Sequence, residues 1–188
     1  MQFSKIGFTP KLIICDIDGT LVDSAGDIQH ALNAALMEMG LATVTEHEVR
    51  GWVGRGASRL VYCVLEAGHH RKDLHDQLLA TFMRHYQAAV CDTSQLYDGV
   101  AEFIAACQQA HIPLACVTNK PYAPAKDLLA ALHILQPFQL LIGGDTLPHK
   151  KPHPEPLLHC LRYFGVAAKD TLVLGDSRND VEAALAAH

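Results

Sequence analysis

Near its start the chain reads Leu12-Ile13-Ile14-Cys15-Asp16-Ile17-Asp18-Gly19-Thr20, an apolar run that ends in two closely spaced carboxylates. A short, continuous apolar run rich in β-branched residues is typical of a strand that is buried on both faces, as in a parallel sheet. The stretch therefore predicts a parallel strand with Asp16 and Asp18 at its carboxyl end.

Three further apolar runs have the same character, at residues 114–117, 140–142 and 171–174. Between the runs, the apolar residues recur with helical spacing, and Pro154 or Pro156 is placed to open the last of the predicted helices. These helices cover residues 100–110, 123–131 and 154–164. Alternating strands and helices predict an α/β fold whose core is a Rossmann-like parallel sheet with helices on its faces.

The segment between the first and second strands breaks this alternation. It shows helical patterns at residues 28–39, 57–67 and 74–89 and no convincing buried strand. We therefore expect an all-helical cap domain at 23–95, inserted after the first strand of a core domain made of 1–22 and 96–188. Such an insertion stands over the carboxyl end of the sheet, where open α/β folds bind their ligands.

Composition limits the classes of partner. With 188 residues, 49% hydrophobic and 19% charged, the chain can bury a sizeable core. The net charge of −5 has the wrong sign for collecting nucleic acid, so an anionic ligand needs a local positive site. No stretch is long and apolar enough to span a membrane, and the six cysteines include no C-x-x-C pair. We expect a cytoplasmic protein with reduced thiols and no membrane or nucleic-acid partner, and its oligomeric state stays open.

Two acidic motifs follow predicted strands: D-x-D-x-T at 16–20 and G-D-x-x-x-D at 175–180. In a chain of this composition they are expected by chance only about 0.04 and about 0.06 times, respectively. Aspartates that merely start turns or cap helices are the simpler alternative for each motif alone. Gathered at one sheet edge, Asp16, Asp18, Asp176 and Asp180 would repel by about 4 kcal/mol per close pair at a dielectric constant near 20. A divalent cation relieves this repulsion, and an all-oxygen set favours Mg²⁺ over zinc or copper.

Donor and cationic groups accompany the aspartates. Thr118 and Asn119 end the second core strand, where a hydroxyl and free backbone amides suit phosphate oxygens. Lys151 directly precedes Pro152, whose ring stiffens the backbone that carries the ammonium. Alone, these are more often a strand-end hydroxyl and a solvated charge. Beside two acidic motifs, they indicate a phosphate site.

In their order along the chain, the motifs at 16–20, Thr118-Asn119, Lys151-Pro152 and 175–180 resemble the four motifs of the haloacid dehalogenase superfamily of phosphohydrolases. The likeness covers nearly the whole chain, and the helical insertion has the position of that superfamily's first type of cap. The segments 51–56, 117–121, 150–154 and 175–180 are most similar to the branch that hydrolyses 2-phosphoglycolate, a small phosphorylated metabolite.

The resemblance implies a role for each motif residue. Asp16 attacks phosphorus and forms an aspartyl-phosphate, and Asp18 protonates the leaving alcohol and then takes a proton from the attacking water. The implied Mg²⁺ ligands are Asp16, the Asp18 carbonyl, Asp176 and, through water, Asp180. The implied ligands of the remaining phosphoryl oxygens are Thr118, the Asn119 amide and Lys151.

Substrate selection is expected to involve the glycine-rich segment 51–56, which is expected to form a loop that enters a helix. Its glycines permit close approach of a ligand, and Arg55, with Arg59 one turn later, is positioned to grip a substrate carboxylate. A glycine-rich turn with a solvated arginine and a core Trp52 is the equal alternative. The twelve histidines form no metal-binding pattern and are expected to be solvated.

The family core usually continues past the helix after the fourth motif into another strand, whereas this sequence ends at His188. We therefore expect an incomplete core in which residues 171–174 form a sheet edge. Three alternatives to the phosphoglycolate reaction stay open: a sugar-phosphate phosphatase or phosphosugar mutase, a non-catalytic phospho-acceptor domain, and a regulatory domain that lost catalysis by truncation.

Overall fold

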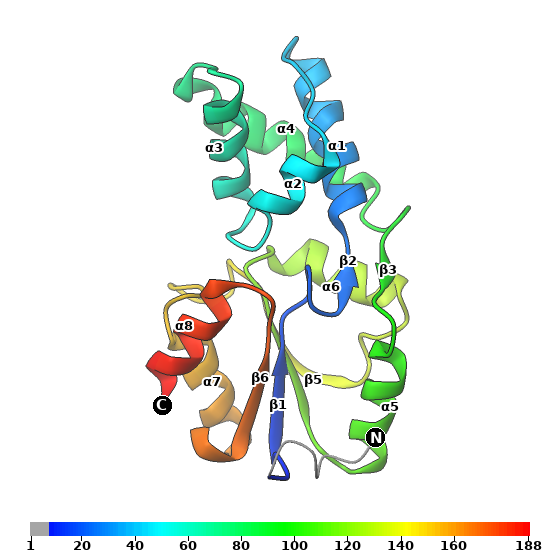
Figure 1. Ribbon diagram of the computed structural model, residues 1–188, viewed down its shortest axis with the longest axis vertical. Helices are drawn as coiled ribbons and strands as arrows, with labels where there is room; N and C mark the ends of the chain where they lie inside the picture. Colours follow the sequence, from blue (N-terminus) through cyan, green and yellow to red (C-terminus); the bar gives the residue numbers. More distant parts are fainter. Residues whose placement is uncertain (1–7) are drawn as a thin grey trace.

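Four parallel strands form the centre of the computed structural model, which describes residues 8–188 (Figure 1). In spatial order they are β5 (Phe138–Ile142), β4 (Leu114–Val117), β1 (Leu12–Cys15) and β6 (Thr171–Leu174). The predicted parallel sheet is confirmed, and only β5 begins two residues earlier than expected.

Helices cover both faces of this sheet. On one face lie α5 (Val100–Gln109) and α6 (Tyr122–Ala131), and on the other α7 (Glu155–Phe164) and α8 (Arg178–Ala187). Because side chains alternate along a strand, Ile13 and Cys15 pack with the first pair and Leu12 and Ile14 with the second. Burial of β1 on both faces explains why its sequence is continuously apolar.

Strand β6 is one edge of the sheet. Its pairing with β1 runs from Leu12 opposite Thr171 to Cys15 opposite Leu174. Within residues 8–188, no strand lies on its other side. All four of its residues are only partly buried. The predicted edge position of residues 171–174 is confirmed.

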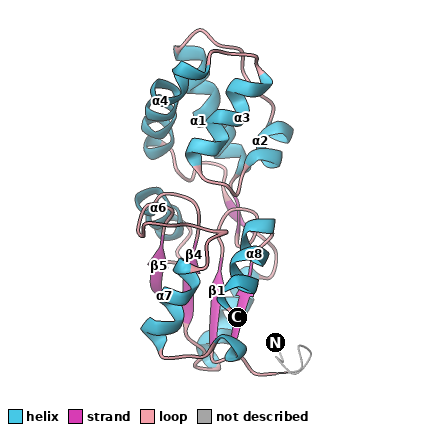
Figure 2. Cartoon of the chain, turned by 90° about the vertical axis from the view of Figure 1, so that its left-hand side faces the viewer, coloured by secondary structure: helices cyan, strands magenta, loops and turns pink. Residues whose placement is uncertain are grey.

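A bundle of helices stands beyond the carboxyl ends of the strands (Figures 1 and 2). It contains α1 (Ala25–Glu38), α2 (Glu46–Trp52), α3 (Ala57–Ala67), the short 3-10 helix Lys72–Leu74 and α4 (His75–Ala88). The bundle has its own apolar core, in which side chains of α1, α3 and α4 pack together. The expected helical cap over the carboxyl edge is therefore present.

Helix α2 was not expected from the apolar pattern. Its signal is polar: the Thr45 hydroxyl accepts a hydrogen bond from the Glu48 amide, and the Glu48 carboxylate accepts one from the Thr45 amide. The prediction that Gly51 and Trp52 lie in a loop was wrong, because both belong to the last turn of this helix.

The two crossings between cap and core lie side by side. They pair as short antiparallel strands, β2 (Val22–Asp23) and β3 (Gln95–Leu96), which apolar runs could not indicate. The buried Asp27 carboxylate reinforces the crossing by accepting hydrogen bonds of 2.6–3.1 Å from the amides and hydroxyls of Thr93 and Ser94. The predicted domain limits at 23 and 95 fall in this pair, and the division itself stays a prediction.

Among residues 8–188, no helix has both the length and the apolar character that crossing a membrane requires.

Candidate active site

The carboxyl ends of the strands converge beneath the helical cap (Figure 1). Asp16 and Asp18 follow β1, Thr118 and Asn119 follow β4, and Asp176 follows β6. The remaining two groups arrive from other segments, which are the β5–α7 loop for Lys151 and helix α8 for Asp180. Parallel strands bring these groups to one edge because all of the strands end there.

Three of the four aspartates form a cluster. Asp16, Asp176 and Asp180 each place one carboxylate oxygen within 4.8 Å of the others. The buried Lys151 ammonium offsets their charge: it lies 3.1 Å from Asp16 Oδ1, donates to Asp180 Oδ1 at 2.5 Å, and donates to the Val117 carbonyl at 2.7 Å. Asp16 is only 4% exposed, and this burial raises its pKa to about 6 although Lys151 acts in the opposite direction.

The donors of this cluster are all carboxylate oxygens, the ligand type that Mg²⁺ prefers. Gly19 has φ +86°, and a Cβ there would lie 2.3 Å from Asp176 Oδ2, so glycine lets Asp176 lie against the 16–20 turn. Asp176 also accepts a hydrogen bond of 3.0 Å from the Thr20 hydroxyl. Asp180 Oδ2 is occupied by the amide and hydroxyl of Ser177, which caps α8. Asp180 thus belongs both to the capping box at the start of α8 and to the cluster.

The Asp18 carboxylate lies outside the three-carboxylate cluster. The Lys120 ammonium donates to both of its oxygens at 2.8 Å, and the Ser24 hydroxyl donates to Oδ1 at 2.6 Å. The side chain of Asp18 is thereby held toward β4 and the first turn of the cap. Its main-chain carbonyl is the group that the resemblance assigned to the metal.

Lys120 is a residue of the candidate site that was not predicted from the sequence. It was visible two residues after Thr118, yet nothing in the local pattern shows which carboxylate a lysine meets. Burial acts to lower the pKa of Lys120, but the facing Asp18 carboxylate outweighs it and raises that pKa above its ordinary value. The ammonium also lies 4.8 Å from the centre of the Tyr86 ring in α4, so it contacts both core and cap.

Thr118 and Asn119 occupy the end of β4 as expected, but their side chains differ in what they contact. The Thr118 hydroxyl accepts a hydrogen bond from the Lys120 amide, which leaves its own proton to donate. The Asn119 side-chain amide donates to the carbonyls of Gly54 and Lys151 at 2.9 Å. It therefore ties the cap loop and the lysine loop to the strand end.

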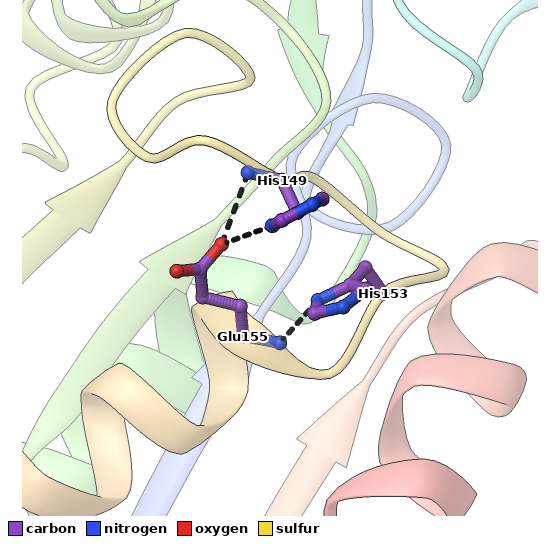
Figure 3. A group of neighbouring side chains, drawn as sticks. All are labelled: His149, His153 and Glu155. Atoms are coloured by element: carbon purple, nitrogen blue, oxygen red, sulfur yellow. Dashed lines mark hydrogen bonds and ion pairs between the residues drawn. The ribbon is translucent and has the colours of Figure 1, made fainter.

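The loop that carries Lys151 is braced by three neighbouring polar side chains (Figure 3). Glu155 accepts hydrogen bonds from the amide and ring of His149, and its own amide donates to the His153 ring. The two exposed rings stack with centroids 4.1 Å apart and planes 19° apart. Ring-nitrogen lone pairs lie in the ring planes, so the lone pairs of two nearly parallel rings do not converge on one ion. We interpret this group as a brace for the loop.

A cavity that opens to solvent lies between the strand ends and the cap. Polar groups line its core side and apolar groups its cap side. The polar groups are Asp16, Asp18, Thr118, Asn119 and Lys120, and the apolar groups include Ile28, Leu60, Phe82 and Met83. A small substrate bound here would meet Asp16 and Asp18 with one end and the cap with the other.

Arg55 lies outside this cavity. Gly54 and Gly56 line the cavity, whereas the exposed Arg55 between them lines an open groove with Arg59 and Lys150. Lys151 also borders the groove. The position of Arg55 therefore suits attraction of anions toward the site more than contact with a substrate inside the cavity, and its role in substrate binding stays a prediction.

The chain is similar to known hydrolases over nearly its whole length. Residues 13–188 match the family model described as haloacid dehalogenase-like hydrolase. The phosphoglycolate phosphatase of Nitrosococcus oceani is 40% identical over 182 residues, which cover 95% of this chain and 81% of that protein. The phosphoglycolate phosphatase of Pseudomonas putida is 40% identical over 185 residues, covering 96% of this chain and 68% of that protein.

Among solved structures, a predicted phosphoglycolate phosphatase from Haemophilus somnus 129PT is similar along most of its length. It superposes with a TM-score of 0.89 at 35% identity and covers 94% of this chain and 81% of that chain. The similarity thus includes both the sheet and the helical cap.

Proposed function

Because the chain belongs to the haloacid dehalogenase-like hydrolases, we propose that it is a Mg²⁺-dependent phosphatase of small phosphorylated metabolites, with 2-phosphoglycolate as its substrate. The observation that carries the proposal is the convergence of Asp16, Asp176 and Asp180 around the Lys151 ammonium at one strand end. Relatives that are 40% identical and carry the name phosphoglycolate phosphatase support the choice of substrate.

Asp16 is the proposed nucleophile. Its Oδ1 accepts a hydrogen bond of 2.8 Å from the Ile17 amide and pairs with Lys151, so the carboxylate has a defined orientation at the floor of the cavity. Attack on phosphorus forms an aspartyl-phosphate as the ester P–O bond breaks. Water then attacks phosphorus, phosphate leaves, and the Asp16 carboxylate is regenerated.

Asp18 is the proposed proton carrier. It donates a proton to the leaving alcohol in the first step and receives one from the attacking water in the second, so protons balance over the cycle. Lys120 and Ser24 hold its carboxylate at the wall of the same cavity as Asp16. In the proposed mechanism, the leaving group and the water approach Asp18 from this cavity.

The charge of the phosphoryl group is offset by several groups. Thr118 has a hydroxyl proton to donate, and the Lys151 ammonium lies beside Asp16. The Asn119 main-chain amide completes the proposed set. Bound Mg²⁺ would be held by Asp16, the Asp18 carbonyl and Asp176, with Asp180 acting through water, and would supply further charge neutralisation.

Phosphate release tests the proposal. The assay compares 2-phosphoglycolate, several sugar phosphates and an aryl phosphate, with and without Mg²⁺, for the parent protein and for Asp16→Asn. We expect Mg²⁺-dependent release by the parent, fastest from phosphoglycolate, and loss of at least about a thousandfold in Asp16→Asn because a nucleophile is removed. The matched control is Asp127→Asn, an exposed carboxylate on α6, which should retain parental activity.

Other outcomes would favour the alternatives. Preference for a sugar phosphate would indicate a sugar-phosphate phosphatase, and isomerisation of a phosphosugar would indicate a mutase. Absence of phosphate release from every ester by the parent would contradict the proposal and favour a non-catalytic phospho-acceptor or a regulatory domain.

A further inference from the structure

The hydroxyl of Tyr86 has no hydrogen-bond partner among the described residues, although the side chain is buried. Tyr86 lies on α4 of the cap, is 2% exposed, and lines the same cavity as Asp16 and Asp18. Buried hydroxyls are normally paired, because losing water without gaining a partner is unfavourable. An unpaired hydroxyl facing a substrate cavity therefore points to a partner on the substrate.

The groups around Tyr86 determine what that partner must be. Lys120 is the neighbouring polar group, and a lysine ammonium has protons to donate but no lone pair to accept one. The neighbouring Asp18 carboxylate accepts from Lys120 and Ser24. The Tyr86 proton consequently requires an acceptor that a ligand brings.

Lys120 adds a preference for charge. Two of its hydrogen bonds go to the two oxygens of Asp18, and the ammonium also lies over the Tyr86 ring, so its positive charge stands beside the Tyr86 hydroxyl at the cavity wall. A hydroxyl donor beside a positive charge matches a carboxylate, which accepts hydrogen bonds and carries the opposite charge.

The remaining cap wall disfavours polyhydroxyl ligands. It is apolar, formed by Ile28, Leu60, Phe82 and Met83. Sugar hydroxyls placed against these side chains would exchange hydrogen bonds with water for none with the protein. A short carbon chain ending in a carboxylate satisfies both the apolar wall and the hydroxyl donor beside the positive charge.

We propose that Tyr86, together with Lys120, binds the carboxylate at the non-phosphorylated end of the substrate, so that the cavity selects phosphorylated hydroxy acids. This assignment rests on the proposed phosphatase function, which places the phosphate at Asp16. It gives the cap a specificity residue inside the cavity, whereas Arg55 lies in the groove outside it.

The test compares two substrates that differ by the carboxylate, 2-phosphoglycolate and ethyl phosphate. Tyr86→Phe keeps the ring and removes only the hydroxyl. We expect kcat/KM for phosphoglycolate to fall about 10- to 100-fold, as for loss of a hydrogen bond to a charged group, with a much smaller change for ethyl phosphate. Tyr163→Phe, an exposed tyrosine on α7, is the matched control and should change neither value.

The thermal stability of Tyr86→Phe distinguishes a role of the hydroxyl in substrate recognition from a role in packing. Since the hydroxyl is unpaired in the protein, its removal should leave the melting temperature unchanged or raise it. A Tyr86→Phe variant that loses activity equally on both substrates, or that keeps parental kcat/KM for phosphoglycolate, would overturn the assignment.

Binding separates this assignment from the proposed function. Calorimetric titration of both compounds into Asp16→Asn with Mg²⁺ measures preference for the carboxylate without turnover. If phosphoglycolate binds more tightly than ethyl phosphate, and Tyr86→Phe removes this preference, the assignment is supported. This holds even if the parent hydrolyses neither ester, because absence of hydrolysis would contradict only the proposed function. Equal binding of the two compounds overturns the assignment even if the parent is an active phosphatase.

Discussion

Replacement of Lys120 by methionine should destabilise the protein strongly, because it leaves the Asp18 carboxylate without its cation. The two side chains are 5% and 10% exposed, and Lys120 Nζ lies 2.8 Å from both Asp18 oxygens. At a dielectric constant near 20, two unit charges at this separation attract by about 6 kcal/mol before desolvation is subtracted. Removing one partner of a buried pair typically costs about 3–5 kcal/mol, and we expect a loss in that range.

Urea unfolding of the parent, Lys120→Met, Asp18→Asn and the double variant measures this interaction as a double-mutant cycle. We expect the double variant to be more stable than Lys120→Met, because an amide is less unfavourable than an unpaired carboxylate in the same place. Lys126→Met, which removes an exposed lysine on α6, is the control and should change stability by less than about 0.5 kcal/mol.

A loss below about 1 kcal/mol for Lys120→Met, or strictly additive effects in the cycle, would refute the reasoning. Either result would mean that Asp18 finds its stabilisation elsewhere. Phosphate release by Lys120→Met then shows separately whether the ion pair also orients Asp18 for proton transfer.

Three further predictions concern other parts of the molecule. Asp27→Asn should lower the free energy of unfolding by about 2–4 kcal/mol at pH 7, because amides of residues 93 and 94 lose acceptors. Burial acts to raise the pKa of Asp27, but hydrogen bonds from Ser94 and Thr93 hold it below its ordinary value. This stabilisation is thus present above the unfolded carboxyl pKa of about 3.9 and is lost as pH falls through the lower folded value, so urea unfolding should show the parent and variant converging below about pH 4. A difference independent of pH would contradict this account. Gly19→Ala should raise the Mg²⁺ concentration for half-maximal phosphate release, because the new Cβ displaces the Asp176 carboxylate; an unchanged Mg²⁺ titration would remove Asp176 from the proposed metal ligands. Arg55→Ala should lower kcat/KM for phosphoglycolate and ethyl phosphate by the same factor, about two- to fivefold and larger at low ionic strength, as expected for a charge that attracts anions. A decrease in kcat/KM for phosphoglycolate alone would indicate instead that Arg55 binds the substrate carboxylate.

The sequence alone was sufficient for the core strands and for the alternation of strands and helices along the chain. Strands buried on both faces require continuous apolar runs, and three of the four core strands have the predicted bounds. The polar residues that follow these runs could also be predicted to lie near one another, because the carboxyl ends of parallel strands lie at the same edge of the sheet. Asp16, Asp176, Asp180 and Lys151 meet there as expected.

Three elements escaped the apolar pattern, for two different reasons. Helix α2 had a local signal in its capping box, Thr45 with Glu48, that apolar periodicity does not detect. The two-residue strands β2 and β3 had none, because each is too short to show a periodic pattern and the two lie far apart in the sequence.

Only the tertiary structure decided which side chains face one another across the cavity. Lys120 follows β4 and Tyr86 belongs to a cap helix, and no periodicity relates either position to Asp18. Likewise, Arg55 and its neighbouring glycines face different spaces because the loop passes between the cavity and the groove. Local sequence specifies where a chain bends and which residues are buried. The meeting of cap and core depends on how two separately packed apolar clusters dock, and that docking determines what the polar groups between them contact.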